Sequence, residues 1–192
     1  MVARFDDELW ELVPEDLGPP PAHLVEFVRE LAEAEHVLDL GCGDGRLTSE
    51  LRAGTITAAD VSEVALRRAA LRLPEAEIAH VAPDEPLPFV DGEFELVLCT
   101  ETIEHVRDVQ LFLSEVRRVL RPGGGLALTT PAHDRLTALR LAARGFESGF
   151  DPLSPHLRFF TRRSLAGLLD AMGFDMVSIT RRGPTLLARA TR

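Results

Sequence analysis

Val37-Leu38-Asp39-Leu40-Gly41-Cys42-Gly43-Asp44-Gly45 is the stretch of sequence that decides the fold of this chain. An apolar run suited to a buried strand ends here, and three glycines then alternate with small or polar residues. An amphipathic segment follows from Arg46 to Leu51. This order predicts a strand over His36–Leu40, a tight glycine loop, and a helix from about Gly45 to Ala53. Glycine permits positive φ and lets a ligand lie against bare backbone, while a helix start offers unpaired N–H donors.

The spacing of the glycines narrows the choice of ligand. The dinucleotide-binding fingerprint, G-x-G-x-x-G, would place its third glycine at position 46, where this chain has Arg46. The third glycine is Gly45 instead, which disfavours a nicotinamide-dependent oxidoreductase. On this motif alone, a glycine turn that binds no ligand stays open as an alternative.

Length and composition predict a single globular domain over residues 1–192, with 45% hydrophobic and 27% charged residues. The net charge of −10 argues against non-specific nucleic-acid binding, which needs clustered basic side chains. The chain has no lysine and no tyrosine, which excludes a lysine base, a Schiff base and a tyrosine phenol. It has two cysteines, no signal-peptide pattern and no apolar run near the ~20 residues of a membrane span, so we expect a cytoplasmic protein that does not bind a membrane.

Strand and helix signals alternate along the rest of the chain. We expect helices at Ala22–Ala34, Ser62–Pro74, Val109–Leu120, Asp134–Arg144 and Thr161–Gly173. We expect further strands at Thr55–Ala59, Glu77–Val81, Phe94–Thr100 and Leu126–Thr130, and a terminal hairpin at Phe174–Thr180 and Thr185–Ala190. Proline and glycines at 121–125 should stop the helix before them. The alternation predicts an α/β fold whose parallel sheet contains one antiparallel strand.

Two segments lie outside this regular pattern. Residues 1–21 form an acidic N-terminal arm that carries Trp10 and ends in three prolines, and it either packs over the site or is a partly ordered tail. Residues 131–160 form a long connection at the carboxyl end of the sheet, where a substrate lid belongs.

Four features occur in this order along the chain. They are the glycine loop at 39–45, the strand-tip Asp60, the stretch Leu87-Pro88-Phe89-Val90-Asp91-Gly92-Glu93-Phe94-Glu95-Leu96-Val97, and Val119-Leu120-Arg121-Pro122-Gly123-Gly124. Together they resemble the class I S-adenosylmethionine-dependent methyltransferases. The chain ending, His156-Leu157-Arg158-Phe159-Phe160-Thr161 through Gly173-Phe174, is similar to their small-molecule branch. The resemblance implies a Rossmann-like, doubly wound sheet of seven strands in the order 3-2-1-4-5-7-6, with strand 7 antiparallel. It also implies S-adenosylmethionine as the cofactor.

The resemblance assigns cofactor-binding roles to residues at the strand tips. Asp39 and the loop backbone at Gly41 and Gly43 would hold the methionine part, and Asp60 would accept hydrogen bonds from both ribose hydroxyls. The cofactor-binding residues implied as a whole are Asp39, Gly41, Cys42, Gly43, Asp60, Val61, Asp84 and Thr100. The family places an acid for the adenine four residues before Leu-Pro-Phe, where this chain has Pro83. Asp84, one position later, is the nearest substitute.

Glu101, Glu104 and His105 are the candidate catalytic residues, because they follow the fourth strand and share one face of a helical turn. His105 is the best available base. Ubiquinone-pathway O-methyltransferases carry a similar Glu-x-x-Glu-His. Small-RNA 2′-O-methyltransferases carry Glu-x-x-Glu-His-His followed by a distant His and bind a divalent ion, whereas this chain has Val106 in place of the second paired histidine. His156 could then be a distant fourth ligand. A site that lacks metal is the favoured interpretation.

Three functions remain open from the sequence. The first is an enzyme that transfers a methyl group from S-adenosylmethionine to oxygen or nitrogen of a small metabolite. The second is a divalent-metal-dependent RNA-end 2′-O-methyltransferase, and the third is a non-catalytic cofactor-binding regulatory or assembly protein. The sequence identifies neither the acceptor nor the oligomeric state.

Overall fold

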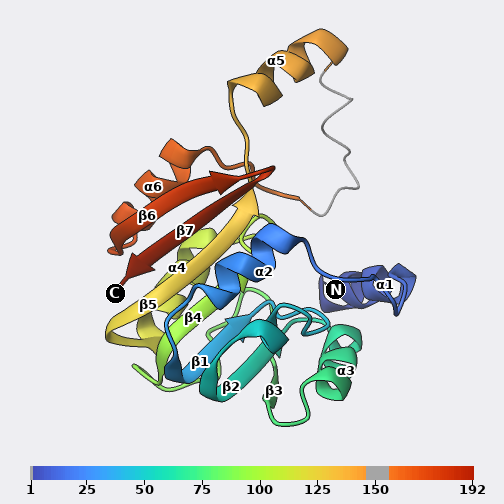
Figure 1. The fold of residues 1–192 in the computed structure, drawn as a ribbon, viewed down its shortest axis with the longest axis vertical. Helices are drawn as coiled ribbons and strands as arrows, with labels where there is room; N and C mark the ends of the chain where they lie inside the picture. The colour runs from blue at the N-terminus through green and yellow to red at the C-terminus, as the bar shows by residue number, and fades with distance from the viewer. Residues whose placement is uncertain (1, 146–155) are drawn as a thin grey trace.

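The computed structural model describes residues 2–145 and 156–192, which fold around one seven-stranded sheet (Figure 1). The strand order is β3-β2-β1-β4-β5-β7-β6, and β7 runs antiparallel to both of its neighbours. The strands are β1 Ala34–Leu40, β2 Ala53–Asp60, β3 Glu77–His80, β4 Phe94–Thr100, β5 Leu120–Pro131, β6 Asp175–Arg182 and β7 Thr185–Thr191. This topology confirms the predicted fold class.

Helix caps fix most of the connections between the strands. The helices are α1 Val2–Leu12, α2 Ala22–Arg29, α3 Glu63–Arg72, α4 Val109–Val119, α5 Arg135–Arg144 and α6 Arg162–Ala171. Ser62 and Thr161 accept hydrogen bonds from backbone N–H groups in the first turns of α3 and α6, and Asp108 does so for α4. The predicted helices therefore lie close to their expected starts, although α2 ends at Arg29 and not at Ala34.

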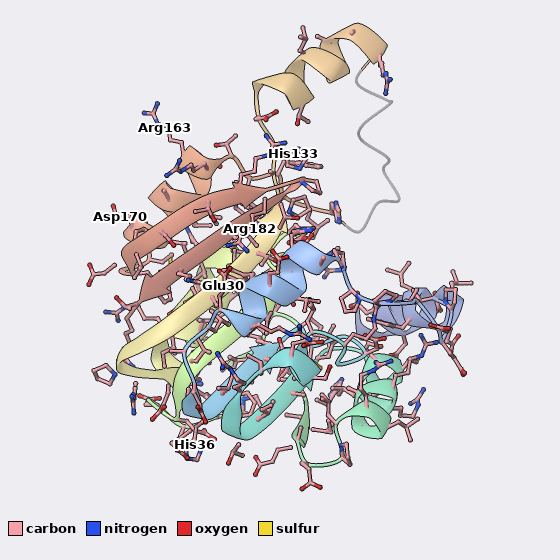
Figure 2. The ribbon with its side chains drawn as sticks, viewed as in Figure 1. Glu30, His36, His133, Arg163, Asp170 and Arg182 are labelled. Carbon is pink, nitrogen blue, oxygen red and sulfur yellow. The ribbon has the colours of Figure 1, made fainter. Side chains whose placement is uncertain are left out.

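Helices cover both faces of the sheet, as a doubly wound fold requires. On one face, α2 buries Phe27 and Val28 against Leu98 of β4 and Leu187 of β7. On the other face, the core includes residues of α4 and α6. Glu30, just after α2, accepts hydrogen bonds from Arg182 at 2.9 and 3.0 Å (Figure 2). Exposed ion pairs of this kind contribute little to stability. The apolar contacts of α2 therefore hold the helix on the sheet.

The helix expected over Gly45–Ala53 does not form. In its place the structure has a single 3₁₀ turn, η1 Thr48–Glu50. Gly45 has φ +79°, outside the helical region, and Ala53 already pairs with Ala34 in the sheet. The few residues between these two positions are too short for a regular helix. Their amphipathic pattern instead places Leu47 and Leu51 against the core.

The fifth strand begins six residues before its predicted start. Leu120 directly follows α4, and β5 continues through the Pro-Gly-Gly-Gly segment that was expected only to stop the helix before it. The N–H of Gly123 donates to the carbonyl of Arg192, and the N–H of Arg192 donates to the carbonyl of Gly124. Pairing with the end of the chain therefore extends this strand, which local sequence preference cannot foresee.

The long connection after β5 carries α5, which projects away from the sheet (Figure 1). Asp134 caps α5 and Gly145 ends it, as predicted. The part of the expected lid at 146–155 lies outside the described residues. At the end of the connection, Ala132 and Phe160 form an isolated β-bridge. Among the described residues, no helix is long and apolar enough to cross a membrane.

Candidate active site

A cavity of about 980 Å³ lies at the carboxyl ends of β2, β1 and β4. Because these strands are parallel, their tips meet at one edge of the sheet, which is where open α/β sheets bind ligands. The cavity is also bounded by residues of α1 and by the segment between β4 and α4. Most of the predicted site residues line it, namely Gly41, Cys42, Gly43, Asp60, Val61, Asp84, Thr100, Glu101 and His105.

The glycine loop turns tightly beneath the cavity because its three glycines have positive φ. The N–H groups of Gly41 and Cys42 donate to the carbonyl of Ala59 at 2.8 and 3.0 Å, and the N–H of Gly43 donates to Asp60 at 2.9 Å. These donors are thus already engaged within the protein. What the loop offers a ligand is bare backbone surface and carbonyl oxygens.

Asp60 at the tip of β2 is held at both oxygens and is 8% exposed. Its Oδ2 accepts from the N–H of Gly43 and its Oδ1 from the N–H of Ser62, both at 2.9 Å. Burial raises the pKa of this carboxyl, and these backbone hydrogen bonds oppose the rise. Each carboxylate oxygen has a further lone pair. The side chain can therefore accept hydrogen bonds from hydroxyl groups of a ligand in the cavity.

Asp39 lies behind the glycine loop and is not among the residues that line the cavity. Its place in the sheet register is beside Ala58 and Leu98, on the face covered by α2. The side chain is buried, and the hydroxyl of Thr48 donates to its Oδ2 at 2.6 Å. Burial raises the pKa of Asp39 to about 7. The observed hydrogen bond links Asp39, before the glycine loop, to Thr48, after it. A direct contact of Asp39 with the cofactor stays a prediction.

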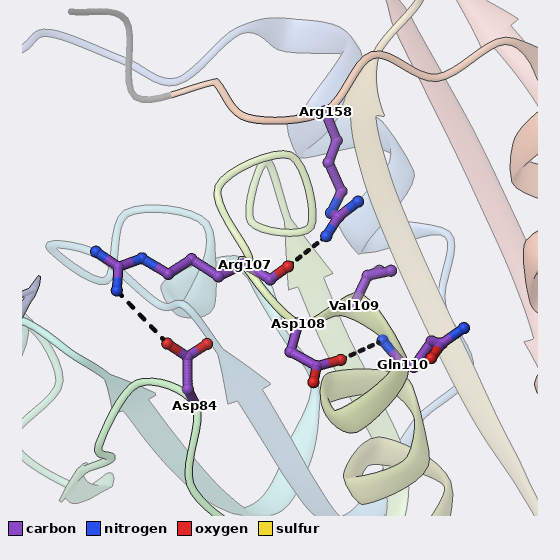
Figure 3. Close-up of a pocket in the computed structure, with 6 residues that line it drawn as sticks. All are labelled: Asp84, Arg107, Asp108, Val109, Gln110 and Arg158. Atoms are coloured by element: carbon purple, nitrogen blue, oxygen red, sulfur yellow. Dashed lines mark hydrogen bonds and ion pairs between the residues drawn. The ribbon is translucent and has the colours of Figure 1, made fainter.

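Asp84 has φ +59° and lies where the cavity meets a smaller hollow of about 490 Å³ (Figure 3). Its carboxylate is 3.8 Å from the guanidinium of Arg107. In the same hollow, Nε of Arg158 donates to the carbonyl of Val106 at 3.0 Å. Asp84 is thus at the edge of the cavity, as an adenine-binding acid would need to be, and that role remains a prediction.

Glu101 lines the cavity directly after β4, with φ +51°. Its N–H donates to the carbonyl of Thr129 at 3.1 Å, and its carboxylate accepts from the Thr129 hydroxyl at 2.9 Å. Burial raises the pKa of Glu101. Two contacts to β5 therefore hold this carboxylate at the tip of β4.

Glu104, His105 and His156 gather beside the cavity, and their potential ligand atoms all lie within 4.8 Å of one another. The main-chain N–H groups of Leu157 and Arg158 donate to the Glu104 carbonyl, which brings the end of the long connection to this point. Glu104 is buried, and its Oε1 is 4.0 Å from Nε2 of His105. The rings of His105 and His156 are 4.9 Å apart. Glu101, the fourth residue of the predicted metal site, is not in this group.

One carboxylate and two imidazoles are ligands that suit a divalent ion. The distances between their ligand atoms, up to 4.8 Å, are slightly too long for all three to bind one ion. Two ligands each about 2.1 Å from one ion lie at most about 4.2 Å apart, so small side-chain movements would be needed. Glu104 Oε1 has no hydrogen-bond partner among the described residues, which leaves it able to coordinate. Only these three of the four candidate ligands come together, and a metal site stays an alternative to the site without metal that the sequence favours.

Two features of the cavity involve residues that the sequence did not assign to the site. Asp6 and Trp10 of α1 line it, in agreement with one of the two alternatives that the sequence left open for this arm. His23 and Thr185 also line it and are joined by a 3.0 Å hydrogen bond. These two residues are 162 positions apart, and no sequence signal connects them.

Comparisons with known proteins agree with this geometry. Residues 11–179 match the model of a protein family described as "Methyltransferase domain". The chain is 34% identical over 183 residues to a malonyl-[acyl-carrier protein] O-methyltransferase of Methylococcus capsulatus, covering 90% of this chain and 60% of that protein. It is 34% identical over 153 residues to the human mitochondrial arginine-hydroxylase NDUFAF5, covering 74% of this chain and 42% of that protein. The chain thus spans about half the length of the curated relatives it matches.

A solved structure supports the same fold. The S-adenosylmethionine-dependent methyltransferase structure from Methanosarcina mazei superimposes with a TM-score of 0.67 at 22% identity, covering 91% of this chain and 99% of that chain. At this identity the likeness concerns the fold alone. Together, the family match, the strand order and the strand-tip cavity confirm the resemblance seen in the sequence. The chain belongs to the class I S-adenosylmethionine-dependent methyltransferases.

Proposed function

We propose that this protein transfers a methyl group from S-adenosylmethionine to an oxygen or nitrogen atom of a small-molecule acceptor. The observation that carries the proposal is that one cavity contains both halves of such a site. The glycine loop and Asp60 line it on the side of β1 and β2, and Glu101 and His105 line it after β4. A cofactor and an acceptor bound along this edge would therefore meet near the tip of β4.

The first task of the chain is to bind and orient the cofactor. Asp60 is suited to two ribose hydroxyls because a carboxylate accepts hydrogen bonds and carries no donor of its own. Gly41 and Gly43 line the cavity, so the backbone of the glycine loop is placed to contact the methionine part. Val61 and Thr100 line the same cavity and give the cofactor apolar and polar contacts.

The second task is to manage the proton of the acceptor. The sulfonium of the bound cofactor supplies the driving force for methyl transfer. A hydroxyl or amine acceptor becomes more nucleophilic when a nearby base takes its proton. His105 and Glu101 both line the cavity where such a base is needed. His105 is the proposed base, because an imidazole accepts protons near neutral pH.

The size of the cavity supports a small acceptor. Pockets for small ligands and cofactors measure roughly 300–1,000 Å³, and this cavity of about 980 Å³ has room for a cofactor and a further molecule of metabolite size. Oxygen as the acceptor atom is supported by the relative named as a malonyl-[acyl-carrier protein] O-methyltransferase. Another relative is named as an arginine-hydroxylase, an activity other than methyl transfer. The test of the proposal therefore measures methyl transfer itself.

A second candidate is a methyl transfer that depends on a divalent ion, as in the RNA-end 2′-O-methyltransferases. The convergence of Glu104, His105 and His156 favours this possibility. A bound ion would polarise the acceptor oxygen. The chain has 31 acidic and 21 basic residues, and this net negative charge repels the phosphates of a long nucleic acid. A long nucleic acid is therefore not favoured as the acceptor.

The test is to incubate the protein with isotopically labelled S-adenosylmethionine and separate panels of phenols, carboxylic acids, amines and short RNA ends. We expect label in a low-molecular-weight product, with matching formation of S-adenosylhomocysteine, and a large loss of both in Asp60→Ala. Adding a chelator to the same reaction separates the two candidates. Binding of the cofactor without transfer to any class of acceptor would instead support a regulatory or assembly role.

A further inference from the structure

The N-terminal helix α1 is attached to the part of the fold that bears the cofactor side of the cavity. Asp7 Oδ1 accepts from the Ser62 hydroxyl at 2.6 Å and from the N–H of Val64 at 3.1 Å, at the start of α3. Arg68 of α3 donates to the carbonyl of Val13 at 3.0 Å. Further along, Arg46 donates to the carbonyl of Gly18 at 2.9 Å. These contacts hold the arm on α3 and on the glycine loop.

One face of α1 is turned toward the cavity. Asp6, Leu9 and Trp10 all line it, and their spacing at i, i+3 and i+4 places them on the same side of the helix. Asp7, which makes the contacts to α3, is not among the lining residues. The helix thus has separate residues for attachment and for facing a ligand.

Trp10 lies directly over the glycine loop. A Cβ atom built on Gly43 would lie 2.9 Å from Cζ2 of the indole, so the ring and the backbone of Gly43 are in close contact. The guanidinium of Arg68 lies over the same ring, 5.7 Å from its centre, and makes a cation–π contact with it. The indole therefore packs on the glycine loop at Gly43 and forms part of the cavity wall there.

Asp6 is a second carboxyl that lines the same cavity as Asp60. Burial raises the pKa of Asp6, and the nearby charge of Asp60 adds to the rise. Two carboxyl groups at one site repel each other when both are ionised. Hydroxyl donors placed between them would relieve this repulsion, and a ribose offers two such donors on adjacent carbons.

We propose that α1 is a wall of the cofactor site, in which Asp6 accepts a hydrogen bond from a nucleoside hydroxyl beside Asp60 and Trp10, packed on the glycine loop, contacts the bound cofactor. Asp7 is the positioning residue that fixes this wall to α3. The proposal rests on the proposed function in one respect, namely that the ligand of the cavity is S-adenosylmethionine or its demethylated product.

The fluorescence of the protein tests this directly, because Trp10 is the single tryptophan of a chain without tyrosine. Titration of the full-length chain with S-adenosylhomocysteine should change the Trp10 emission in a saturable way, with the same dissociation constant as calorimetry gives. This measurement needs no substitution, so it holds even where a variant fails to fold.

Two pairs of variants provide matched controls. Asp6→Asn should weaken S-adenosylhomocysteine binding by about tenfold through loss of a charge-assisted hydrogen bond, whereas Glu11→Gln removes the same charge from an exposed position and should not. Trp10→Ala should weaken binding by a similar factor of about ten, whereas Leu12→Ala, at a residue 82% exposed, should not.

The outcomes separate this inference from the proposed function. If calorimetry shows that the wild-type chain does not bind S-adenosylhomocysteine, the proposed function fails. If the chain binds it while the Trp10 emission stays constant, or if Asp6→Asn and Trp10→Ala bind as tightly as their controls, the inference about α1 is overturned and the proposed function stands.

Discussion

Glu104→Gln should change how the stability of the protein depends on pH. Glu104 is 1% exposed, and its Oε2 accepts from the Thr130 hydroxyl at 3.0 Å. Burial is the main reason that its pKa rises from an ordinary value of 4.5 to about 7, and the charge of Glu101 adds to the rise. Glutamine keeps an oxygen for Thr130 and has no charge to bury.

The sign and size of the effect follow from the difference between the folded and unfolded pKa values. Between pH 4.5 and about 7 the folded state holds a proton on Glu104 that the unfolded state has lost, so the free energy of unfolding falls as pH rises. This stability is fully present below pH 4.5 and is lost as pH rises to about 7. At about 1.4 kcal/mol per pKa unit, the interval corresponds to about 3 kcal/mol.

The measurement is denaturant unfolding of wild type and Glu104→Gln from pH 4.5 to pH 8. The difference in free energy of unfolding between variant and wild type should shift by about 3 kcal/mol in favour of the variant from pH 4.5 to pH 8. This shift does not depend on how stable the variant is at pH 4.5. Glu115→Gln is the control, because hydrogen bonds from Arg118 lower the pKa of Glu115. Its titration lies below the ordinary value of 4.5, so the stability of this variant relative to wild type should stay nearly constant from pH 4.5 to pH 8. Parallel curves for wild type and Glu104→Gln would refute the assignment of a buried, protonated Glu104.

Three further changes test the site. Asp60→Asn should weaken S-adenosylhomocysteine binding by about 1–3 kcal/mol in calorimetry, because the amide accepts fewer hydrogen bonds, while Glu77→Gln on the next strand should not. His105→Ala should lower turnover by ~10²-fold with no effect of chelator if His105 is a base; if it is a metal ligand, chelation should abolish the wild-type activity and Mn²⁺ should restore it. A Gly/Ser linker in place of residues 135–155 should abolish methyl transfer and leave cofactor affinity within a few-fold, since those residues carry none of the cofactor motifs. Undiminished turnover in either of the last two variants, or unchanged affinity in the first, would contradict the corresponding role.

Much of the fold could be predicted because its elements carry strong local signals. The apolar run Phe94–Thr100 is β4 to the residue, and Ser62 and Thr161 cap helices where expected. The segment after the glycine loop could not be predicted. Its amphipathic pattern suits a helix and a packed turn equally well, and the pairing of Ala34 with Ala53 in the sheet decides between them.

The candidate site was predictable where it depends on strand tips. Asp60, Thr100 and Glu101 follow parallel strands, and the topology alone brings them to one cavity. The orientation of Asp39 depends on the sheet register, which turns its side chain to the covered face. The contacts of Asp7 with Ser62 and of His23 with Thr185 join distant parts of the chain, and one sequence carries no information about such pairs.

The most direct test of the central claim is calorimetric titration of the full-length chain with S-adenosylhomocysteine, with NAD⁺ as the comparison ligand. The cavity beside the glycine loop and Asp60 predicts one S-adenosylhomocysteine site per chain, lost or greatly weakened in Asp60→Ala, and no binding of NAD⁺. Binding of NAD⁺ without binding of S-adenosylhomocysteine would contradict the account.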